Sequence, residues 1–309
     1  MTILLCDAGG THARFAISKD GQQIEDPQKI KISDFPDFSS IASHFLNSQN
    51  VKVQDITEFR LSLGDRNTWN ITQEKIAQCM TRAHLIKIND FEANAYGIAY
   101  ATNDQFVLLN RPTGTASKGT SKCVMGVGTG LGHAYIIDTK SGPYIQRSHG
   151  AHMIPATLNQ SQVELYQSLQ KFKQDQTCPI YEDMLSGSGI WHMYQLACEA
   201  AHTHVEYTDT NDMLNRGRND PLVQQILAVF HENLGIYAHQ LTAFGFSYKG
   251  IYLTGGIIDR LVGNNLWDQG SFEKTFKQNN VPIVSADVEA TPLYWVKDEY
   301  IALTGLLRI

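Results

Sequence analysis

The sequence predicts an α/β fold from three observations: apolar strands alternate with helical segments, glycine-rich turns follow several strands, and the chain is long enough for two domains. The predicted strands are 3–6, 13–17, 85–88, 123–127, 133–137 and 250–254. The predicted helices are 71–83, a stretch beginning at Asp90, 160–173, 189–202, 221–244 and 298–307. With 309 residues, 42% hydrophobic and 18% charged, the chain can bury a sizeable core.

The first glycine-rich turn comprises Asp7, Ala8, Gly9, Gly10 and Thr11, between the first two strands. Glycine lets the backbone adopt positive φ and lets a ligand approach, and N–H groups directed into such a turn bind anions. Because Asp7 is itself an anion, we expect it to hold Mg²⁺ or its waters beside bound phosphates, with Thr11 adding a hydroxyl donor. For this turn alone, a plain hairpin is an equally good interpretation.

A second turn of this kind, Gly128-Thr129-Gly130-Leu131-Gly132, also lies between two strands, and a third, Gly255-Gly256, leads from a strand into a helical pattern. The GxxxxGK[ST] pattern of P-loop NTPases does not occur. A dinucleotide-binding fingerprint is also excluded, because Leu131 takes the place of its third glycine and a strand follows instead of a helix. The recurrence of these turns therefore predicts nucleotide-phosphate binding.

A candidate general base lies in the segment Ile88-Asn89-Asp90-Phe91, which ends a strand and opens a helix. At a helix N-terminus the macrodipole favours the ionised form of Asp90, as a base requires. A simple helix-capping role is the competing interpretation.

Five motifs carry a resemblance to a known family. They are Asp7-x-Gly9-Gly10-Thr11-x-x-Arg14, Asn89-Asp90-Phe91, Gly128-Thr129-Gly130-Leu131-Gly132, Glu182-x-x-Leu185-Ser186-Gly187 and Gly255-Gly256-Ile257. In order and approximate spacing the chain resembles bacterial glucokinase over nearly its whole length. The resemblance implies the two-lobed actin-like ATPase (ribonuclease H-like) fold with a cleft between lobes. The small lobe would comprise residues 1–105, rejoined by a C-terminal helix at 297–309, and the large lobe residues 106–296.

The resemblance also implies an activity and a set of roles. The protein would transfer phosphate from ATP, with Mg²⁺, to the 6-hydroxyl of glucose or a related sugar, and Asp90 would take the hydroxyl proton. The two turns at 7–11 and 128–132 would hold the phosphates, and Gly255-Gly256 would lie by the adenosine. Asn89, His152 and Glu182 would bind other sugar hydroxyls.

The residues expected to bind the sugar depart from the family pattern at two places. Where the family has Gly-Glu-Gly-Gly-His, this chain has Ser148-His149-Gly150-Ala151-His152, so His149 replaces a carboxylate that accepts sugar hydrogen bonds. Such a charge-assisted bond contributes about 1.5–3 kcal/mol. The second departure is residues 61–69, LSLGDRNTW, which are shorter than the family's sugar-contacting loop.

Two alternatives follow from these departures. A noncatalytic or weakly active sugar or nucleotide sensor would fit His149 and the short loop, whereas the retained Asp90 favours a kinase. An actin-like or chaperone-type ATPase would fit the phosphate turns but has no need of Asn89, Asp90 and Glu182. The sequence determines neither the sugar nor the oligomeric state, although relatives of this family are often dimers.

Composition excludes several other classes. The net charge is −6, with no Lys- or Arg-rich stripe, so nucleic acid is an unexpected partner. Without a basic leader or a long apolar stretch, we expect a cytoplasmic protein without membrane association. The five cysteines are scattered in apolar runs and favour reduced core thiols. The eleven histidines do not form a zinc-binding pattern.

Overall fold

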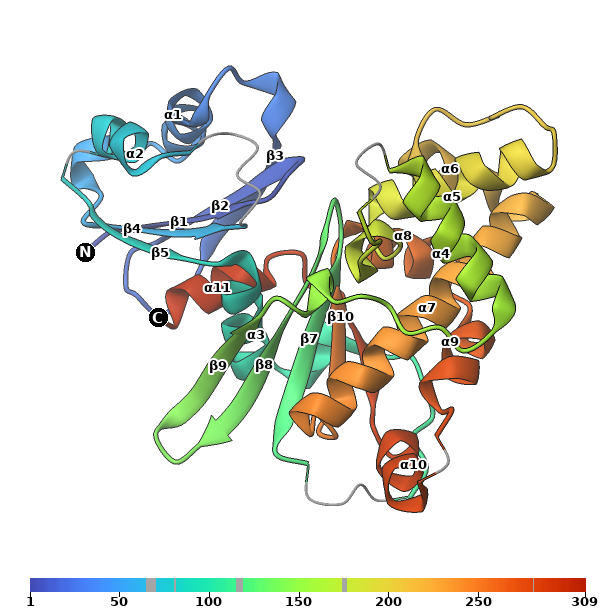
Figure 1. Cartoon of the computed structure of the whole chain (residues 1–309). Coiled ribbons are helices and arrows are strands. Elements are labelled where there is room, and N and C mark those ends of the chain that lie inside the picture. Colours follow the sequence, from blue (N-terminus) through green and yellow to red (C-terminus); the bar gives the residue numbers. More distant parts are fainter. Residues whose placement is uncertain (65–70, 81, 115–118, 174–176, 280) are drawn as a thin grey trace. The chain divides into compact units, whose positions relative to one another are not determined.

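The computed structural model describes all residues except 65–70, 81, 115–118, 174–176 and 280. Its architecture is α/β, as predicted, with two mixed sheets and their covering helices (Figure 1). The chain divides into two units, Met1–Gln105 with Asp298–Ile309, and Phe106–Lys297. Residues 65–69 of the shortened segment 61–69, Trp69 included, lie outside the described residues.

The first unit is built on a five-stranded sheet of order β3-β2-β1-β4-β5. Its strands are β1 (Ile3–Ala8), β2 (His12–Ser18), β3 (Glu25–Lys31), β4 (Glu58–Leu63) and β5 (His84–Ile88), and its helices are α1 (Phe38–Ser48), α2 (Gln73–Cys79), α3 (Asp90–Tyr100) and α11 (Ile301–Leu307). β1 pairs antiparallel with β2 and parallel with β4, and β4 pairs parallel with β5. The carboxyl ends of β1, β4 and β5 therefore meet at one edge of the sheet.

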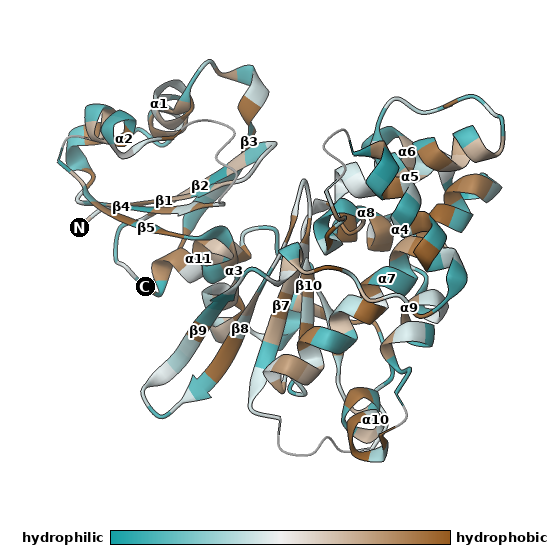
Figure 2. Ribbon diagram, viewed as in Figure 1, coloured by the Kyte–Doolittle hydropathy of each residue, from teal (hydrophilic) through white to brown (hydrophobic). Residues whose placement is uncertain are grey.

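Alternation along β1 sends side chains to both faces of this sheet. Leu4 and Cys6 join a buried cluster that includes residues of α1 and α2, whereas Ile3 and Leu5 join another with residues of α3 and α11. α11 consists mainly of hydrophobic residues and is buried along most of its length (Figure 2). The C-terminal segment thus completes the core of the first unit.

Two glycines allow α3 and α11 to cross closely. A Cβ on Gly97 would collide with the carbonyl oxygen of Ile301, and a Cβ on Gly305 would collide with that of Ala93. Both positions require a residue without a side chain because backbone lies directly against backbone.

The second unit is built on a six-stranded sheet of order β6-β11-β10-β7-β8-β9. Its strands are β6 (Phe106–Leu108), β7 (Ser121–Val127), β8 (Leu131–Thr139), β9 (Gly142–Ser148), β10 (Ile251–Thr254) and β11 (Leu293–Val296). Its helices are α4 (Gln160–Phe172), α5 (Gly187–Ala200), α6 (Thr210–Arg216), α7 (Pro221–Gly245), α8 (Gly256–Gly263), α9 (Gln269–Phe276) and α10 (Pro282–Glu289). Short 3-10 turns η4 (Gly150–His152) and η5 (Tyr181–Asp183) lie between β9 and α5.

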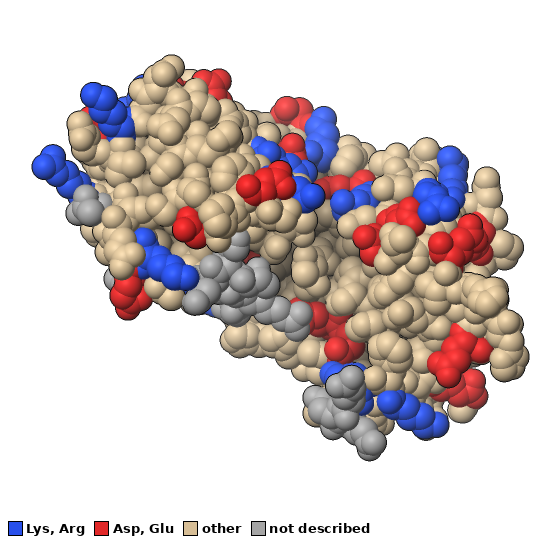
Figure 3. Space-filling view, turned by 90° about the horizontal axis from the view of Figure 1, so that it is seen from above, with Lys and Arg blue, Asp and Glu red and all other residues tan. Residues whose placement is uncertain are grey.

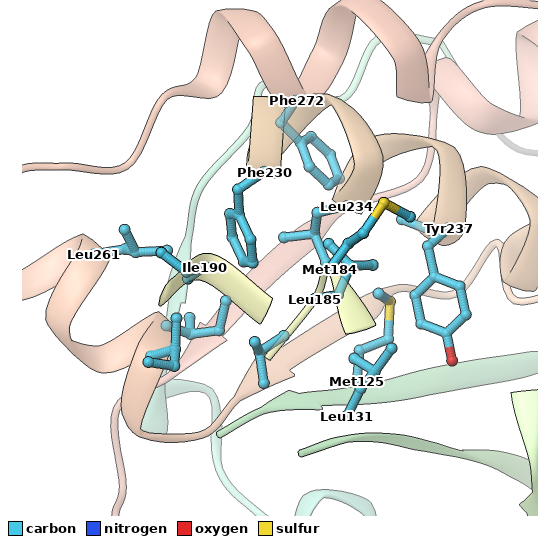
Figure 4. Close-up of a cluster of buried hydrophobic side chains, with 14 of the residues drawn as sticks. Met125, Leu131, Met184, Leu185, Ile190, Phe230, Leu234, Tyr237, Leu261 and Phe272 are labelled. Atoms are coloured by element: carbon cyan, nitrogen blue, oxygen red, sulfur yellow. The ribbon is translucent and has the colours of Figure 1, made fainter. Parts of the chain in front are cut away.

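The core of the second unit forms where α7 packs on the sheet. Phe230 and Leu234 of α7 and Met125 of β7 belong to one buried cluster, which also takes in residues of α5, α8 and α9 (Figure 4). Apolar residues recur along α7 at helical spacing, and Asp220 caps its first turn through Leu222 N–H at 2.8 Å.

Local signals predicted many of the elements but not all of their limits. The helix predicted at 298–307 begins at Ile301, and that predicted at 71–83 covers only Gln73–Cys79 within the described residues. Several elements were not predicted: the strands β3, β4, β6, β9 and β11 and the helices α1, α6, α9 and α10. β3 and β9 are edge strands whose polar, partly exposed sequences lack the apolar run of an inner strand. The prediction of core thiols was wrong for Cys178, which is exposed, whereas Cys6, Cys123 and Cys198 are buried.

Charged side chains of both signs are interspersed on the surface seen in Figure 3. In the described part of the chain, every helix is too short or too polar to cross a bilayer. Within the same residues, His, Cys, Asp and Glu side chains do not gather in threes as a metal site would require.

Candidate active site

The first glycine turn closes the β1–β2 hairpin. Gly9 N–H donates to the His12 carbonyl at 3.1 Å, and a Cβ on Gly9 would lie 3.0 Å from the same oxygen. Ala8 is buried at the end of β1, whereas Gly10 and Thr11 are exposed at the tip. The tip of the turn is therefore open to a ligand, as the sequence predicted for a phosphate-binding turn.

Beneath this turn Asp7 is buried and held by two side chains. Ser62 Oγ donates to Asp7 Oδ1 at 2.7 Å, and Arg14 Nη1 lies 3.3 Å from Oδ2. Asp7 is 7% exposed, so its charge is balanced by Arg14 rather than by bulk water. Sequence reasoning included Arg14 in the motif without a role and missed Ser62, which lies 55 positions along the chain.

Asp90 lies at the same edge of the first sheet. Asp7 is paired in register with Ser62, and Ser62 with Ile88, two residues before Asp90. The sheet register therefore places the first turn and the candidate base at the same edge of the sheet, at the ends of two strands separated by β4.

Asn89, rather than Asp90, is the N-cap of α3. Asn89 Oδ1 accepts from Phe91 N–H at 3.0 Å, and Asp90 Oδ1 accepts from the same N–H at 3.0 Å. Asp90 is the first residue of the helix, where the macrodipole favours its ionised form. The competing capping role thus falls mainly to Asn89.

Gly64, which follows β4, lies directly against the Asp90 carboxylate. A Cβ on Gly64 would come within 2.9 Å of Asp90 Oδ2. Any larger residue there would displace the carboxylate, so Gly64 shapes the surroundings of the candidate base. The sequence offered only a weak signal, a Gly-Asp pair within the shortened segment 61–69.

The second glycine turn links β7 to β8, with Val127 and Leu131 paired in register. Gly128 N–H donates to the Gly130 carbonyl at 2.9 Å, and Gly187 N–H donates to the Gly128 carbonyl at 2.8 Å. Thr129 is exposed at the tip, and Gly132 is buried in β8. The turn is thereby tied to the first residue of α5.

Glu182 supports the second turn from below. Its Oε2 accepts from Leu131 N–H at 2.9 Å, and a Cβ on Gly130 would lie 2.6 Å from the same oxygen. Glu182 is 6% exposed, on η5. The sequence predicted Glu182 only as a sugar ligand, and this bond to the turn was not foreseen because 51 residues separate its partners.

The third turn lies beside the second. Gly255 has φ +103°, and a Cβ there would collide with the Val127 carbonyl at the end of β7. Gly256 is the first residue of α8. A Cβ on Gly187 would lie 3.3 Å from the Gly128 carbonyl and 3.4 Å from Ile257 Cδ1, so the N-termini of α5 and α8 both flank the second turn. Two helix N-termini beside amide-lined glycines favour an anion.

The two candidate sugar histidines lie on one short turn. His149 precedes η4 and His152 ends it, and their rings stack with centroids 5.9 Å apart and planes 17° apart. Both side chains are exposed. Tyr181 N–H donates to the Met153 carbonyl at 3.0 Å, so η4 and the Glu182-bearing η5 are neighbours.

A comparison with known proteins decides the family. The sequence profile described as Glucokinase matches residues 4–309, nearly the whole chain. The chain belongs to the glucokinase family. As a member of the glucokinase family the protein is a sugar kinase, and ATP use is supported by the same membership.

Individual relatives agree with this assignment. A glucokinase of Colwellia psychrerythraea is 26% identical over 276 residues, covering 84% of this chain and 82% of its own. A glucokinase of Helicobacter pylori is 28% identical over 288 residues, again covering 84% of this chain and 82% of its own.

Solved structures confirm the predicted actin-like ATPase fold of the glucokinase family. A glucokinase from an Antarctic psychrotroph matches with a TM-score of 0.73 at 25% identity, covering 99% of this chain and 97% of its own. The glucokinase of Balamuthia mandrillaris, solved with glucose, matches with a TM-score of 0.79 at 19% identity, covering 99% of this chain and 92% of its own.

Proposed function

We propose that this protein is an ATP-dependent hexose kinase that phosphorylates the 6-hydroxyl of glucose or a related sugar, with Asp90 as general base. The observation that carries the proposal is the edge of the first sheet. There the register Asp7–Ser62–Ile88 brings a carboxylate at a helix N-terminus to the same sheet edge as a glycine turn with an open tip. Phosphoryl transfer needs this combination of phosphate positioning and a base directed to the attacking hydroxyl.

The phosphates of ATP would be bound by backbone amides of both glycine turns. The support for the second turn comes from the N-termini of α5 and α8, which add positive potential beside Gly128. Gly255, which lies against the Val127 carbonyl at the same end of β7, and Gly256 would lie by the adenosine. The first turn contributes Gly10 and the hydroxyl of Thr11 at its exposed tip.

The Asp7 carboxylate suits an indirect contact with Mg²⁺. Its two oxygens already accept from Ser62 and lie near Arg14, and a cation in direct contact would compete with the guanidinium 3.3 Å away. Mg²⁺ keeps several waters when it binds nucleotide phosphates, so Asp7 would hold such waters. The bound ion would neutralise the phosphate charge.

Four residues would bind the sugar. Asn89 uses Oδ1 for the helix cap, so its Nδ2 group is the part that can donate to a hydroxyl. His152 and Glu182 lie on the neighbouring turns η4 and η5. His149, stacked on His152, would replace the family's carboxylate by an imidazole, which can accept only through its unprotonated nitrogen.

The decisive experiment compares Asp90→Asn with Glu92→Gln in a coupled assay of ADP release over a panel of hexoses. Glu92 is a second acidic residue in the first turn of α3 and serves as the matched control. We expect Asp90→Asn to lower kcat by about 10² to 10⁴, the usual contribution of a general base, with Glu92→Gln near wild type.

Two outcomes would contradict the proposal. Equal losses in both variants would indicate an effect on α3 rather than on chemistry. Sugar binding by calorimetry without turnover in the wild-type protein would instead indicate the noncatalytic sensor.

A further inference from the structure

Under the two turns that carry the proposed sugar residues lies a buried polar pair, His133 of β8 and Tyr237 of α7. His133 Nδ1 and Tyr237 Oη are 2.8 Å apart, and their rings meet edge to face with centroids 5.9 Å apart. His133 is 2% exposed and Tyr237 fully buried. A hydrogen bond in such surroundings fixes both rings, because neither group can exchange its partner for bulk water.

The His133 ring supports η4. A Cβ on Gly150, the first residue of η4, would collide with His133 Cε1. The imidazole edge therefore lies directly on the backbone that leads to His152. Rotation of this ring would leave η4 without its support.

The Tyr237 ring supports η5. It packs on the ring of Tyr181 with centroids 4.6 Å apart and planes tilted by 44°. Tyr181 begins η5 and directly precedes Glu182. Tyr181 is fixed by three hydrogen bonds. Its N–H donates to the Met153 carbonyl at 3.0 Å, and its hydroxyl donates to Gln240 Oε1 at 2.7 Å and accepts from Ala156 N–H at 3.2 Å.

Burial keeps the pair uncharged. It lowers the pKa of His133 to about 4 and raises the pKa of Tyr237 well above its usual value. At neutral pH a neutral imidazole thus faces a protonated phenol, and one proton serves the bond between them.

We propose that His133 and Tyr237 are positioning residues for the sugar site: their hydrogen bond holds η4 and η5 in one arrangement, so that His152 and Glu182 bind the sugar together. This inference rests on the proposed hexose kinase function. Neither residue would touch the sugar.

The test is Tyr237→Phe, which removes one oxygen and leaves both rings in place. Loss of a buried hydrogen bond that leaves its partner unsatisfied should raise the KM for the sugar by about tenfold. The KM for ATP should change less than the KM for the sugar, because the second turn keeps its bond from Gly187 N–H to the Gly128 carbonyl.

The matched control is Tyr135→Phe. Tyr135 is also a buried tyrosine of this region, and its hydroxyl donates to the Leu241 carbonyl of α7 at 3.2 Å. Tyr135→Phe loses a comparable bond between the same strand and helix, but keeps the bond between the two rings that lie against Gly150 and Tyr181. We expect a comparable fall in Tm and an unchanged KM for the sugar.

A second variant, His133→Asn, guards against misfolding of the first. Asn keeps a polar atom near the position of Nδ1, within reach of Tyr237, but withdraws the ring edge from Gly150, so the KM for the sugar should again rise. An unchanged KM for the sugar in both variants, or the same rise in Tyr135→Phe, would overturn the inference. A wild-type protein without sugar-dependent ADP release would instead refute the proposed function itself.

Discussion

The two phosphate turns are alike in sequence but are held by different means. Under the first, Asp7 is fixed by the side chains of Ser62 and Arg14, and the Arg14 side chain is 20% exposed. Under the second, Glu182 accepts a backbone N–H, and two helices begin beside the turn. The first turn depends on an ion pair of which only the Arg14 side is partly exposed, and the second on buried hydrogen bonds made by backbone N–H groups. Substitutions and pH should therefore affect the two units differently.

Acid should destabilise the second unit most. Burial lowers the pKa of His133 and of His231 to about 4, whereas both groups titrate near 6.5 when unfolded. His231 is bound as the neutral form, with Nδ1 at 2.6 Å from the Leu227 carbonyl and Nε2 accepting from Asp268 N–H at 3.3 Å. Between these values the unfolded chain binds more protons, so stability present above about pH 6.5 is lost as pH falls toward 4.

The expected loss is up to about 3 kcal/mol per histidine at 1.36 kcal/mol per pKa unit. Hydrogen exchange measured at pH 7 and pH 5 would show which parts of the protein lose this stability. We expect faster exchange in α7 and β8 at pH 5, after correction for the intrinsic rate, and little change in the strands of the first unit. Equal loss in both units would contradict the assignment to these two histidines.

Removing the carboxylate beneath the second turn should cost more than removing the cation beneath the first. Glu182→Ala leaves the buried Leu131 N–H without its acceptor, which costs about 1–3 kcal/mol and should lower kcat/KM about 10- to 100-fold. Arg14→Gln removes the cation but leaves a side-chain amide that can donate to the buried Asp7, so it should cost about 1 kcal/mol of stability.

Thermal unfolding of both variants, with Glu182→Gln as the control, measures this difference. The glutamine carbonyl can still accept from Leu131, so most of the stability should return while sugar affinity falls. A Tm for Glu182→Ala equal to that of Arg14→Gln would remove the contrast between the turns.

The smallest expected effect separates two glycines of the second turn. A Cβ on Gly130 would press on Glu182 Oε2 at 2.6 Å, whereas a Cβ on Gly128 has no neighbour within 4 Å in the described structure. Gly130→Ala should therefore lower Tm by about 2–4 °C, the equivalent of about 1 kcal/mol, and Gly128→Ala by less than 1 °C on the same scale. An equal fall in Tm for the two variants would show that the Glu182 side chain moves aside for the new methyl group.

The sequence by itself determined the features that depend on neighbouring residues. The alternation of strands and helices, the three glycine turns and the place of Asp90 at the start of a helix follow from local patterns. The motifs in register also indicated the family. Where the pattern was polar or irregular, as in β3, β9 and the start of α11, the same reasoning failed because edge strands and helix ends have weak local signals.

Only the tertiary structure decided which residues support the site. The partners Asp7 and Ser62 are 55 positions apart, Leu131 and Glu182 are 51 apart, and His133 and Tyr237 are 104 apart. No local pattern marks such pairs, because each is created by sheet register or by packing of a helix on a strand. Gly64 shows the same limit of sequence reasoning. It must lack a side chain because the Asp90 carboxylate, which follows a different strand, lies against it.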